Sequence, residues 1–128
     1  MSVEPDFNDK SEWLRCKPMI EAALEYGAGT HTIEDIENCI EDGSLRFFSS
    51  PNSAVIVEIF TSGRKKVISF FLAGGDLTEL KTIIEPRLLG WAKAQGCNQV
   101  RVVGRPGWVR AIRDVGYKSS WMMVYKDI

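Results

Sequence analysis

The spacing of hydrophobic residues changes along the chain, and up to Gly43 it is the spacing of α-helices, with apolar positions every three or four residues. Asp9 and Glu12 have the spacing of a capping box at the start of a first helix. Thr32 and Asp35 stand at the start of a second helix, and Gly43 follows its last apolar turn. The pattern therefore predicts two amphipathic helices ahead of the first strand.

Two prolines fall inside predicted helices. Pro18 interrupts the apolar stripe of the first helix. It either kinks one helix or stands at the first position of a second, shorter one, because proline lacks the amide hydrogen that an interior turn needs. Pro86 lies off the apolar stripe of a later helix, which begins at residue 77 and which Gly96 ends. We expect Pro86 to bend that helix on its solvent side.

Three runs of strand-forming residues follow the first two helices, at residues 45–49, 53–60 and 65–72. The turns between them are so short that they can join only antiparallel neighbours, which predicts a meander. After the later helix, a strand at 100–103 should lie parallel to the strand at 65–72 by the right-handed crossover rule. A short helix that ends at Gly116 and a last strand at 119–126 complete the pattern.

These elements predict an α/β fold of the α+β kind: one domain over residues 1–128, with a mixed, mostly antiparallel sheet and helices on both faces. Residues 1–10 show no clear periodicity and are expected to form a loosely ordered lead-in.

Glu58 stands out within the middle strand. Ala54, Ile56 and Phe60 share its face, so one carboxylate interrupts an otherwise apolar row. If that face is covered, Glu58 needs a partner or a raised pKa. Two interpretations follow: Glu58 reaches water near the rim of the sheet, or it is a general base.

Composition narrows the classes of function. The chain carries 17 acidic and 16 basic residues, so it has no global field to attract nucleic acid or a membrane surface. Its apolar runs are far shorter than the roughly 20 residues that span a bilayer, and the acidic N-terminal segment is unlike a signal peptide. We expect a protein of the cytoplasm that does not enter membranes.

The cysteines and the single histidine are not arranged as the ligands of a metal site. Cys16, Cys39 and Cys97 are far apart and odd in number, and His31 is the single histidine. This predicts free thiols and no metal or disulfide framework. A Cys/His nucleophilic pair stays open, although nothing favours it.

The strand at 65–72 runs into a glycine turn, residues Ala73, Gly74, Gly75 and Asp76. The helix start that follows presents free amide hydrogens and the positive end of the helix dipole, which suits an anion. Asp76 as a simple N-cap is the more economical interpretation. Arg105, in the loop after the strand at 100–103, is placed to reach the same crevice.

Basic and aromatic residues gather around the last helix, namely Arg101, Arg105, Trp108, Arg110 and Arg113. Contacts to phosphates with a stacked base are one interpretation. A solvated helix face with Trp108 packed inward is favoured, because the net charge is near zero and no nucleic-acid module is recognisable.

The order of these elements resembles the GNAT acetyltransferase fold over roughly residues 13–126. The tail is similar as well: a strand, a short helix ending in Val-Gly-Tyr, and a closing strand with the residues WMMVYK. In that family the strand equivalent to residues 67–72 diverges from the next parallel strand. The pantetheine arm of acetyl-CoA lies in the gap, and its diphosphate rests on the following loop.

The resemblance implies acetyl transfer from acetyl-CoA to an amine, with the cofactor held by Phe71, Leu72, Ala73, Gly74, Gly75 and Asp76. Two positions depart from the family pattern. The loop lacks the leading Arg or Gln and carries Asp76 where a diphosphate should dock. The position of the tyrosine that protonates the departing thiolate is occupied by Ile112.

The combination of GGDL, GWAKAQGC, GRPGW and VGY also resembles small proteins encoded in phage and prophage structural-gene regions. That resemblance implies an alternative: a GNAT-like domain without catalysis, acting as an interaction or virion-associated component whose partners are phage structural proteins.

Overall fold

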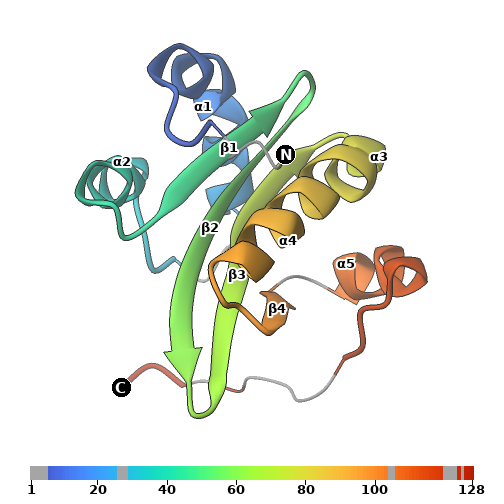
Figure 1. Ribbon diagram of the computed structural model, residues 1–128. Coiled ribbons are helices and arrows are strands. Elements are labelled where there is room, and N and C mark those ends of the chain that lie inside the picture. Colours follow the sequence, from blue (N-terminus) through green and yellow to red (C-terminus); the bar gives the residue numbers. More distant parts are fainter. Residues whose placement is uncertain (1–5, 26–28, 104–105, 120–123, 125) are drawn as a thin grey trace.

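The computed structural model describes residues 6–25, 29–103, 106–119, 124 and 126–128 (Figure 1). The elements appear in the order expected from the sequence. They are α1 (Lys10–Glu25), α2 (Ile33–Asp42), β1 (Arg46–Ser50), β2 (Ser53–Ser62), β3 (Lys65–Gly75), α3 (Leu77–Glu79), a π-helical turn (Leu80–Ile84), α4 (Glu85–Ala94), β4 (Gln99–Val102), α5 (Pro106–Ala111) and a 3₁₀ turn (Arg113–Val115).

The sheet has the strand order β1-β2-β3-β4. The first three strands form the antiparallel meander, and β4 pairs with β3 in parallel. Both predictions are therefore confirmed, as is the α+β class with a mixed sheet. The parallel pair follows from the crossover through α3 and α4, which carries the chain back over one face of the sheet.

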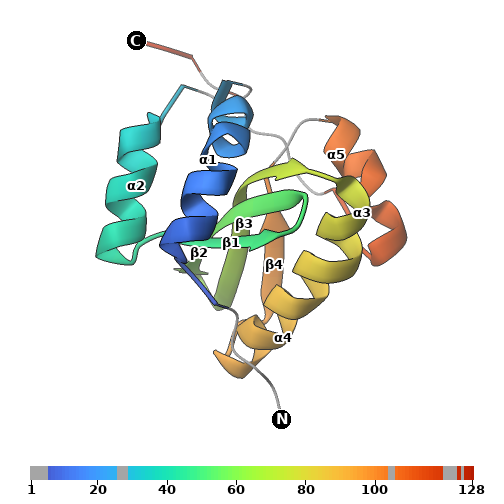
Figure 2. The same ribbon diagram turned by 90° about the horizontal axis from the view of Figure 1, so that it is seen from above.

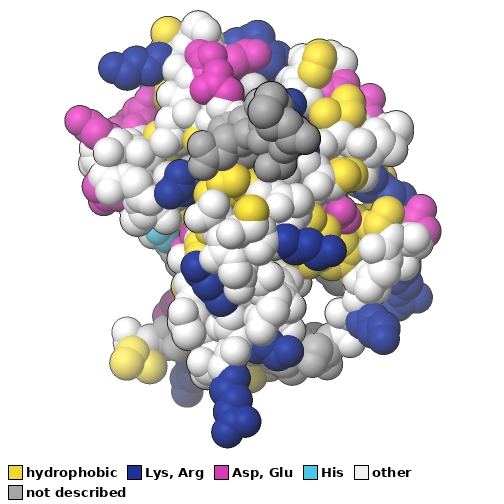
Figure 3. Space-filling view, in the orientation of Figure 1, with side chains coloured by type: hydrophobic (Ala, Val, Ile, Leu, Met, Phe, Trp, Pro, Cys, Tyr) yellow, Lys and Arg dark blue, Asp and Glu magenta, His cyan; other side chains and the backbone are white. Residues whose placement is uncertain are grey.

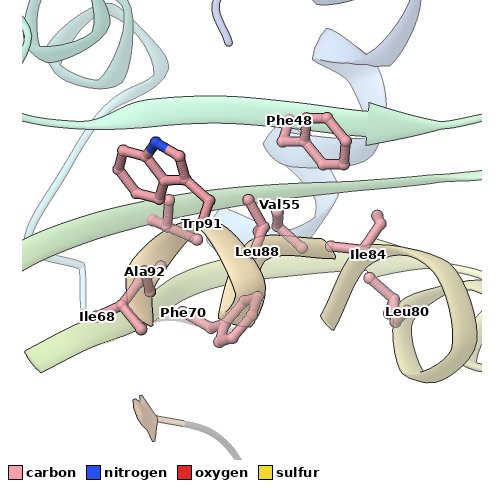
Figure 4. Close-up of a cluster of buried hydrophobic side chains, with 10 residues drawn as sticks. Phe48, Val55, Ile68, Phe70, Leu80, Ile84, Leu88, Trp91 and Ala92 are labelled. Atoms are coloured by element: carbon pink, nitrogen blue, oxygen red, sulfur yellow. The ribbon is translucent and has the colours of Figure 1, made fainter. Parts of the chain in front are cut away.

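Helices cover both faces of the sheet (Figure 2). On one face, α1 and α2 pack against alternate residues of β1 and β2, including Phe47, Ala54 and Ile56. On the other face, the helical segment from α3 to α4 packs against the residues in between (Figure 4). That second core is made of Phe48, Val55, Val57, Ile68, Phe70, Leu80, Ile84, Leu88, Trp91 and Ala92.

The two early helices follow their sequence signals. The side chain of Thr32 accepts a hydrogen bond from the Asp35 amide, the Asp35 carboxylate accepts one from the Thr32 amide, and Gly43 ends α2 with a left-handed backbone. Pro18 lies inside one helix, α1, and does not start a second one. Phe7 and Asn8 were expected in a loosely ordered lead-in. They dock instead: the Phe7 ring packs edge-on against Trp91, and Asn8 exchanges hydrogen bonds with Phe47.

A π-helical turn separates α3 from α4. The Glu85 amide donates to the carbonyl of Leu80, five residues back, and Pro86 follows directly. Proline removes one amide donor and its ring crowds the carbonyl four residues earlier, so a widened turn just before Pro86 relieves both problems. Pro86 thus changes the helix by widening a turn in addition to any bend.

Two expected features lie wholly or largely outside the described residues. Arg105 is one of them, and the last strand, predicted at 119–126, is the other, since residues 120–123 and 125 are not described. In the part of the chain that is described, no helix is long and apolar enough to cross a membrane.

Candidate functional site

Strands β3 and β4 diverge halfway along β3. Their pairing covers four residues and ends with Phe70 opposite Val102. On its other side, β3 stays paired with β2 as far as Gly75. Beyond Phe70, the edge of β3 that faces β4 therefore has no strand partner among the described residues. Its backbone amides and carbonyls are available to another extended chain.

A β-bulge lies where the strands part. Ile56 pairs with Leu72 and Val57 with Phe70, so Phe71 is the extra residue on β3. A bulge bends its strand and increases the local twist, which turns the end of β3 away from β4. The bulge also shifts the alternation of side chains between the two faces of the sheet. Phe71 and Leu72 both pack toward α1 and α2, whereas Ala73 packs toward α4.

A cavity of about 590 Å³ occupies this divergence. Its walls come from α1 and the residues before α2 on one face of the sheet, and from the π-helical turn, α4, α5 and Tyr117 on the other. The edges of β3 and β4 lie between, and Phe71, Leu72 and Ala73 are part of the lining. In Figure 3, apolar side chains show in the hollow between the regions of α4 and α5. The cavity thus connects both faces of the sheet through the gap.

The predicted turn at residues 73–76 is corrected in part, because β3 continues through Gly74 and Gly75, which pair with Ala54 and Ser53. Packing explains both glycines. A Cβ on Gly74 would lie 3.0 Å from the Met19 side chain. Gly75 has a φ of +104°, and a Cβ there would lie 2.1 Å from the Asn52 carbonyl oxygen.

Asp76 is the N-cap of α3, as the simpler interpretation held: its carboxylate accepts a hydrogen bond from the Glu79 amide at 3.1 Å. Glu79 adds a second acid to this helix start. Its carboxylate accepts hydrogen bonds from the Ser50 hydroxyl, from the Asn52 amide at 2.8 Å and from the Asn52 side chain at 2.7 Å. These bonds, that of Ser50 first, lower the pKa of Glu79. Arg15 of α1 also reaches this turn: its guanidinium donates to the carbonyls of Pro51 at 2.8 Å and Ser50 at 2.9 Å, and it pairs with Glu12.

Glu58 lies in the cavity wall on the α1–α2 face. It is half-buried and sits opposite Ser69 of β3, which is 4% exposed and also lines the cavity. Glu58 makes no hydrogen bond or ion pair with the described residues. The structure thus brings the predicted base candidate into the same cavity as Phe71, Leu72 and Ala73, while Gly74, Gly75 and Asp76 are outside its lining.

His31 is a cavity residue that the sequence did not single out as one. Its Nδ1 lies 2.8 Å from the Thr30 hydroxyl, and its ring stands edge-on to Phe71, with 4.9 Å between centroids. Both His31 and Thr30 line the cavity on the α1–α2 face. The available signal was that the single histidine stands at a helix start, but the fold of that loop over Phe71 decides its role.

Tyr117 and Glu85 form a second unforeseen feature, on the α4–α5 face of the cavity. The Tyr117 hydroxyl is buried, and no hydrogen bond of normal geometry satisfies it among the described residues. Burial, followed by the nearby Glu85 carboxylate, raises the pKa of Tyr117 far above its ordinary value. Burial also raises the pKa of Glu85. The phenol is therefore protonated at neutral pH, with the Glu85 carboxylate as the acceptor beside it.

The basic residues near the last helix do not form one patch in the described structure. Trp108 packs against the core on the α4 face, as favoured from the sequence, and Arg110 and Arg113 are exposed. Arg101 lies on β4 with its guanidinium 5.6 Å from the centre of the Phe60 ring. The described residues contain no cluster of three or more His, Cys, Asp or Glu that could hold a metal ion. The three cysteines are free thiols, of which Cys16 is buried.

A scan against protein-family models finds no match, and no curated protein matches the sequence. Solved structures do match the fold. A probable acetyltransferase is 8% identical over 95% of this chain and 97% of its own, with a TM-score of 0.69. An acetyltransferase from Trypanosoma brucei is 12% identical over 95% of this chain and 96% of its own, with a TM-score of 0.65.

A third match is a predicted acetyltransferase from Clostridium acetobutylicum, whose structure was solved with acetyl-CoA. It is 10% identical over 93% of both chains, with a TM-score of 0.66. None of these structures bears on the resemblance to phage-encoded proteins, which stays a prediction. At such low identities the matches establish architecture, and with the divergent β3–β4 pair they show that this chain has the GNAT fold.

Proposed function

We propose that the protein transfers an acyl group, acetyl in the simplest case, from a coenzyme A thioester to an amine. The observation that carries this proposal is the end of β3–β4 pairing at Phe70 and Val102, with a cavity in the gap and an unpaired β3 edge along it. The GNAT fold supports it, as does the structural neighbour that was solved with acetyl-CoA.

The gap fits the thioester arm of such a donor. A pantetheine arm carries two amide groups, and the backbone of Phe71, Leu72 and Ala73 offers the complementary donors and acceptors without a competing strand. The arm would replace β4 as the partner of β3. The reacting thioester would then lie beside the bulge, between the two faces of the cavity.

The reaction needs two proton transfers. The amine nitrogen attacks the thioester carbonyl, a C–N bond forms, the C–S bond breaks, the amine loses a proton and the thiolate gains one. Glu58 is our candidate to accept the proton from the amine, on the α1–α2 face, and His31 in the same wall is the competing group. Tyr117 is our candidate proton donor to the thiolate, on the opposite face.

The site for the diphosphate of coenzyme A is less complete than the gap for the thioester arm. The loop lacks the leading Arg or Gln expected from the family, and the Asp76 carboxylate, which caps α3, stands where the diphosphate would dock. Like charges about 4 Å apart repel by roughly 1 kcal/mol in water. The chain therefore relies on the thioester arm more than on a phosphate-binding loop.

Calorimetric titration with acetyl-CoA tests the proposal, and we expect heat with one site per chain. Ala73→Phe should abolish that heat by filling the gap, whereas Ala94→Phe, at an exposed position at the end of α4, is the matched control. No heat from the wild-type protein at millimolar acetyl-CoA would overturn the proposal. To assign the base, Glu58→Gln and His31→Ala are compared for turnover.

A further inference from the structure

We infer that the acceptor is a primary amine carried on an apolar body, bound with its ammonium group against Glu58. This inference rests on the proposed acyl transfer and concerns the half of the cavity on the α1–α2 face. That half contains Glu58 and Ser69 from the sheet, Ala23 and Leu24 from α1, and His31 and Phe71.

Charge is the first argument. Glu58 is half-buried and, among the described residues, has no hydrogen-bond or ion-pair partner. A bound cation would be attracted to this unpaired carboxylate, which water reaches from one side only. An alkylammonium group supplies one positive charge and three hydrogens, which match the acceptor-only chemistry of a carboxylate. The same carboxylate can then take up the proton that the amine must lose before it attacks.

Nearby cations do not cancel this charge in the described structure. Arg101 is on the same face, two strands from Glu58 and next to Ser69. Its guanidinium stacks on Phe60 and donates to the Gln99 side chain at 2.8 Å, and Arg101 does not line the cavity. Lys81 does line the cavity, but on the other face, where it pairs with Asp114 at 2.8 Å.

The lack of a cation on the α1–α2 side of the described lining also selects against anionic acceptors. A sugar phosphate or an amino acid brings a phosphate or carboxylate that needs Arg, Lys or a set of amide donors. The described wall on this side contains neither Arg nor Lys, and Glu58 would repel a second negative charge. Amines without an acidic group are therefore the class that fits.

The remaining wall indicates what surrounds the amine. Ala23 and Leu24 of α1 and the ring of Phe71 are apolar, and the imidazole of His31 is held edge-on to Phe71 and bonded to Thr30. An alkyl or aryl group would cover this surface and lose contact with water, whereas a polyhydroxylated ring would leave hydroxyls unpaired. Arylalkylamines and medium-chain alkylamines meet both conditions.

Two measurements test this class. First, thiol release from acetyl-CoA is followed with phenethylamine and hexylamine, and with glucosamine 6-phosphate and glutamate. We expect kcat/KM to be at least tenfold higher for the two apolar amines. Second, binding of phenethylamine without acetyl-CoA is measured by ligand-observed NMR. Glu58→Gln should weaken this binding at least tenfold and leave the acetyl-CoA affinity unchanged, and Glu41→Gln, an exposed acid of α2, should change neither.

The outcomes separate the inference from the proposed function. If acetyl-CoA binds and glucosamine 6-phosphate or glutamate is the preferred acceptor, the acyl-transfer proposal stands and the acceptor class is wrong. If acetyl-CoA does not bind, the proposed function fails. In that case phenethylamine binding that depends on Glu58 still supports an amine site, and its absence overturns the inference. Binding that Glu58→Gln does not weaken also overturns it.

Discussion

Gly75 passes so close to Asn52 that a Cβ on Gly75 would lie 2.1 Å from the Asn52 carbonyl oxygen. The Asp76 amide donates to that same carbonyl at 3.0 Å. The end of β3 is thus fixed against the turn between β1 and β2, and the start of α3 with it. This contact gives the glycine a structural reason that does not involve a cofactor.

Gly75→Ala should lower the free energy of unfolding by about 3 kcal/mol, since the methyl group meets rigid backbone and the φ of +104° strains any residue with a Cβ. Urea unfolding measures the change. Gly63→Ala is the control, because its φ of +58° is also positive but no atom lies within 4 Å of the added Cβ. It should cost only about 1 kcal/mol. If the two variants lose the same free energy of unfolding, the contact with Asn52 does not contribute to the effect of Gly75→Ala.

Asp76→Asn should raise the affinity for acetyl-CoA about fivefold, which is the equivalent of removing roughly 1 kcal/mol of repulsion from the diphosphate. Asparagine caps helices as well as aspartate does, so α3 should keep its start. Titration calorimetry at two salt concentrations measures the effect, which should shrink as salt screens the charge.

Asp42→Asn is the matched control for that variant, since it removes a carboxylate that bonds to the Ser44 amide at the end of α2, on the opposite face of the sheet. It should leave acetyl-CoA binding as it is. An unchanged affinity for Asp76→Asn would mean that the diphosphate does not lie at the start of α3.

Glu79→Gln should lower stability at neutral pH, and the loss should disappear in acid. Hydrogen bonds from Ser50 and Asn52 lower the pKa of Glu79, so the folded state binds its proton less readily than the unfolded state does. The stabilisation is therefore complete above the ordinary pKa of about 4.3 and is lost as the pH falls through the lowered value.

Urea unfolding of both proteins at pH 6, 5, 4 and 3.5 tests this sign. The difference in free energy of unfolding between wild type and Glu79→Gln should disappear only at the lowest pH values of the series. Glu41→Gln serves as the control for the change in net charge. A difference that grows in acid would contradict the assignment of Glu79 as a hydrogen-bonded carboxylate.

Much of the fold could be predicted because most of its helices and strands have signals within their own segments of sequence. Thr32 and Gly43 bracket α2, Gly116 ends the last helical turn with a left-handed backbone, and alternation marks the strands. The end of β3 could not be predicted, because glycines are ordinary turn residues. Only their pairing with Ala54 and Ser53 keeps them in the strand.

The site was harder to predict than the fold. Glu58 stood out because a carboxylate interrupts an apolar row, which is a local signal. The bulge at Phe71 depends on the register between two strands, and no single segment encodes that register. His31 reaches the cavity through the fold of its loop, and Tyr117 reaches it beside Glu85 of α4. Both are tertiary effects, so the sequence did not mark either residue as part of a site.

Tyr117→Phe should separate a structural hydroxyl from a catalytic one. The Tyr117 hydroxyl is buried and makes no hydrogen bond of normal geometry with the described residues, with the Glu85 carboxylate beside it, so its removal should change the free energy of unfolding by no more than about 1 kcal/mol. If the phenol protonates the departing thiolate, kcat should fall by roughly a hundredfold, the lower range for a general acid. The acetyl-CoA affinity should not change, because the ring stays in place.

The leaving group gives the decisive comparison for Tyr117. Thiophenyl acetate releases a thiolate that needs no proton to depart, so with this donor Tyr117→Phe should turn over nearly as fast as the wild type. A defect of the same size with both donors would mean that Tyr117 orders the cavity without donating a proton. Full activity of Tyr117→Phe with acetyl-CoA would remove it from the mechanism. In that case burial of the hydroxyl would cost free energy of folding without a catalytic role.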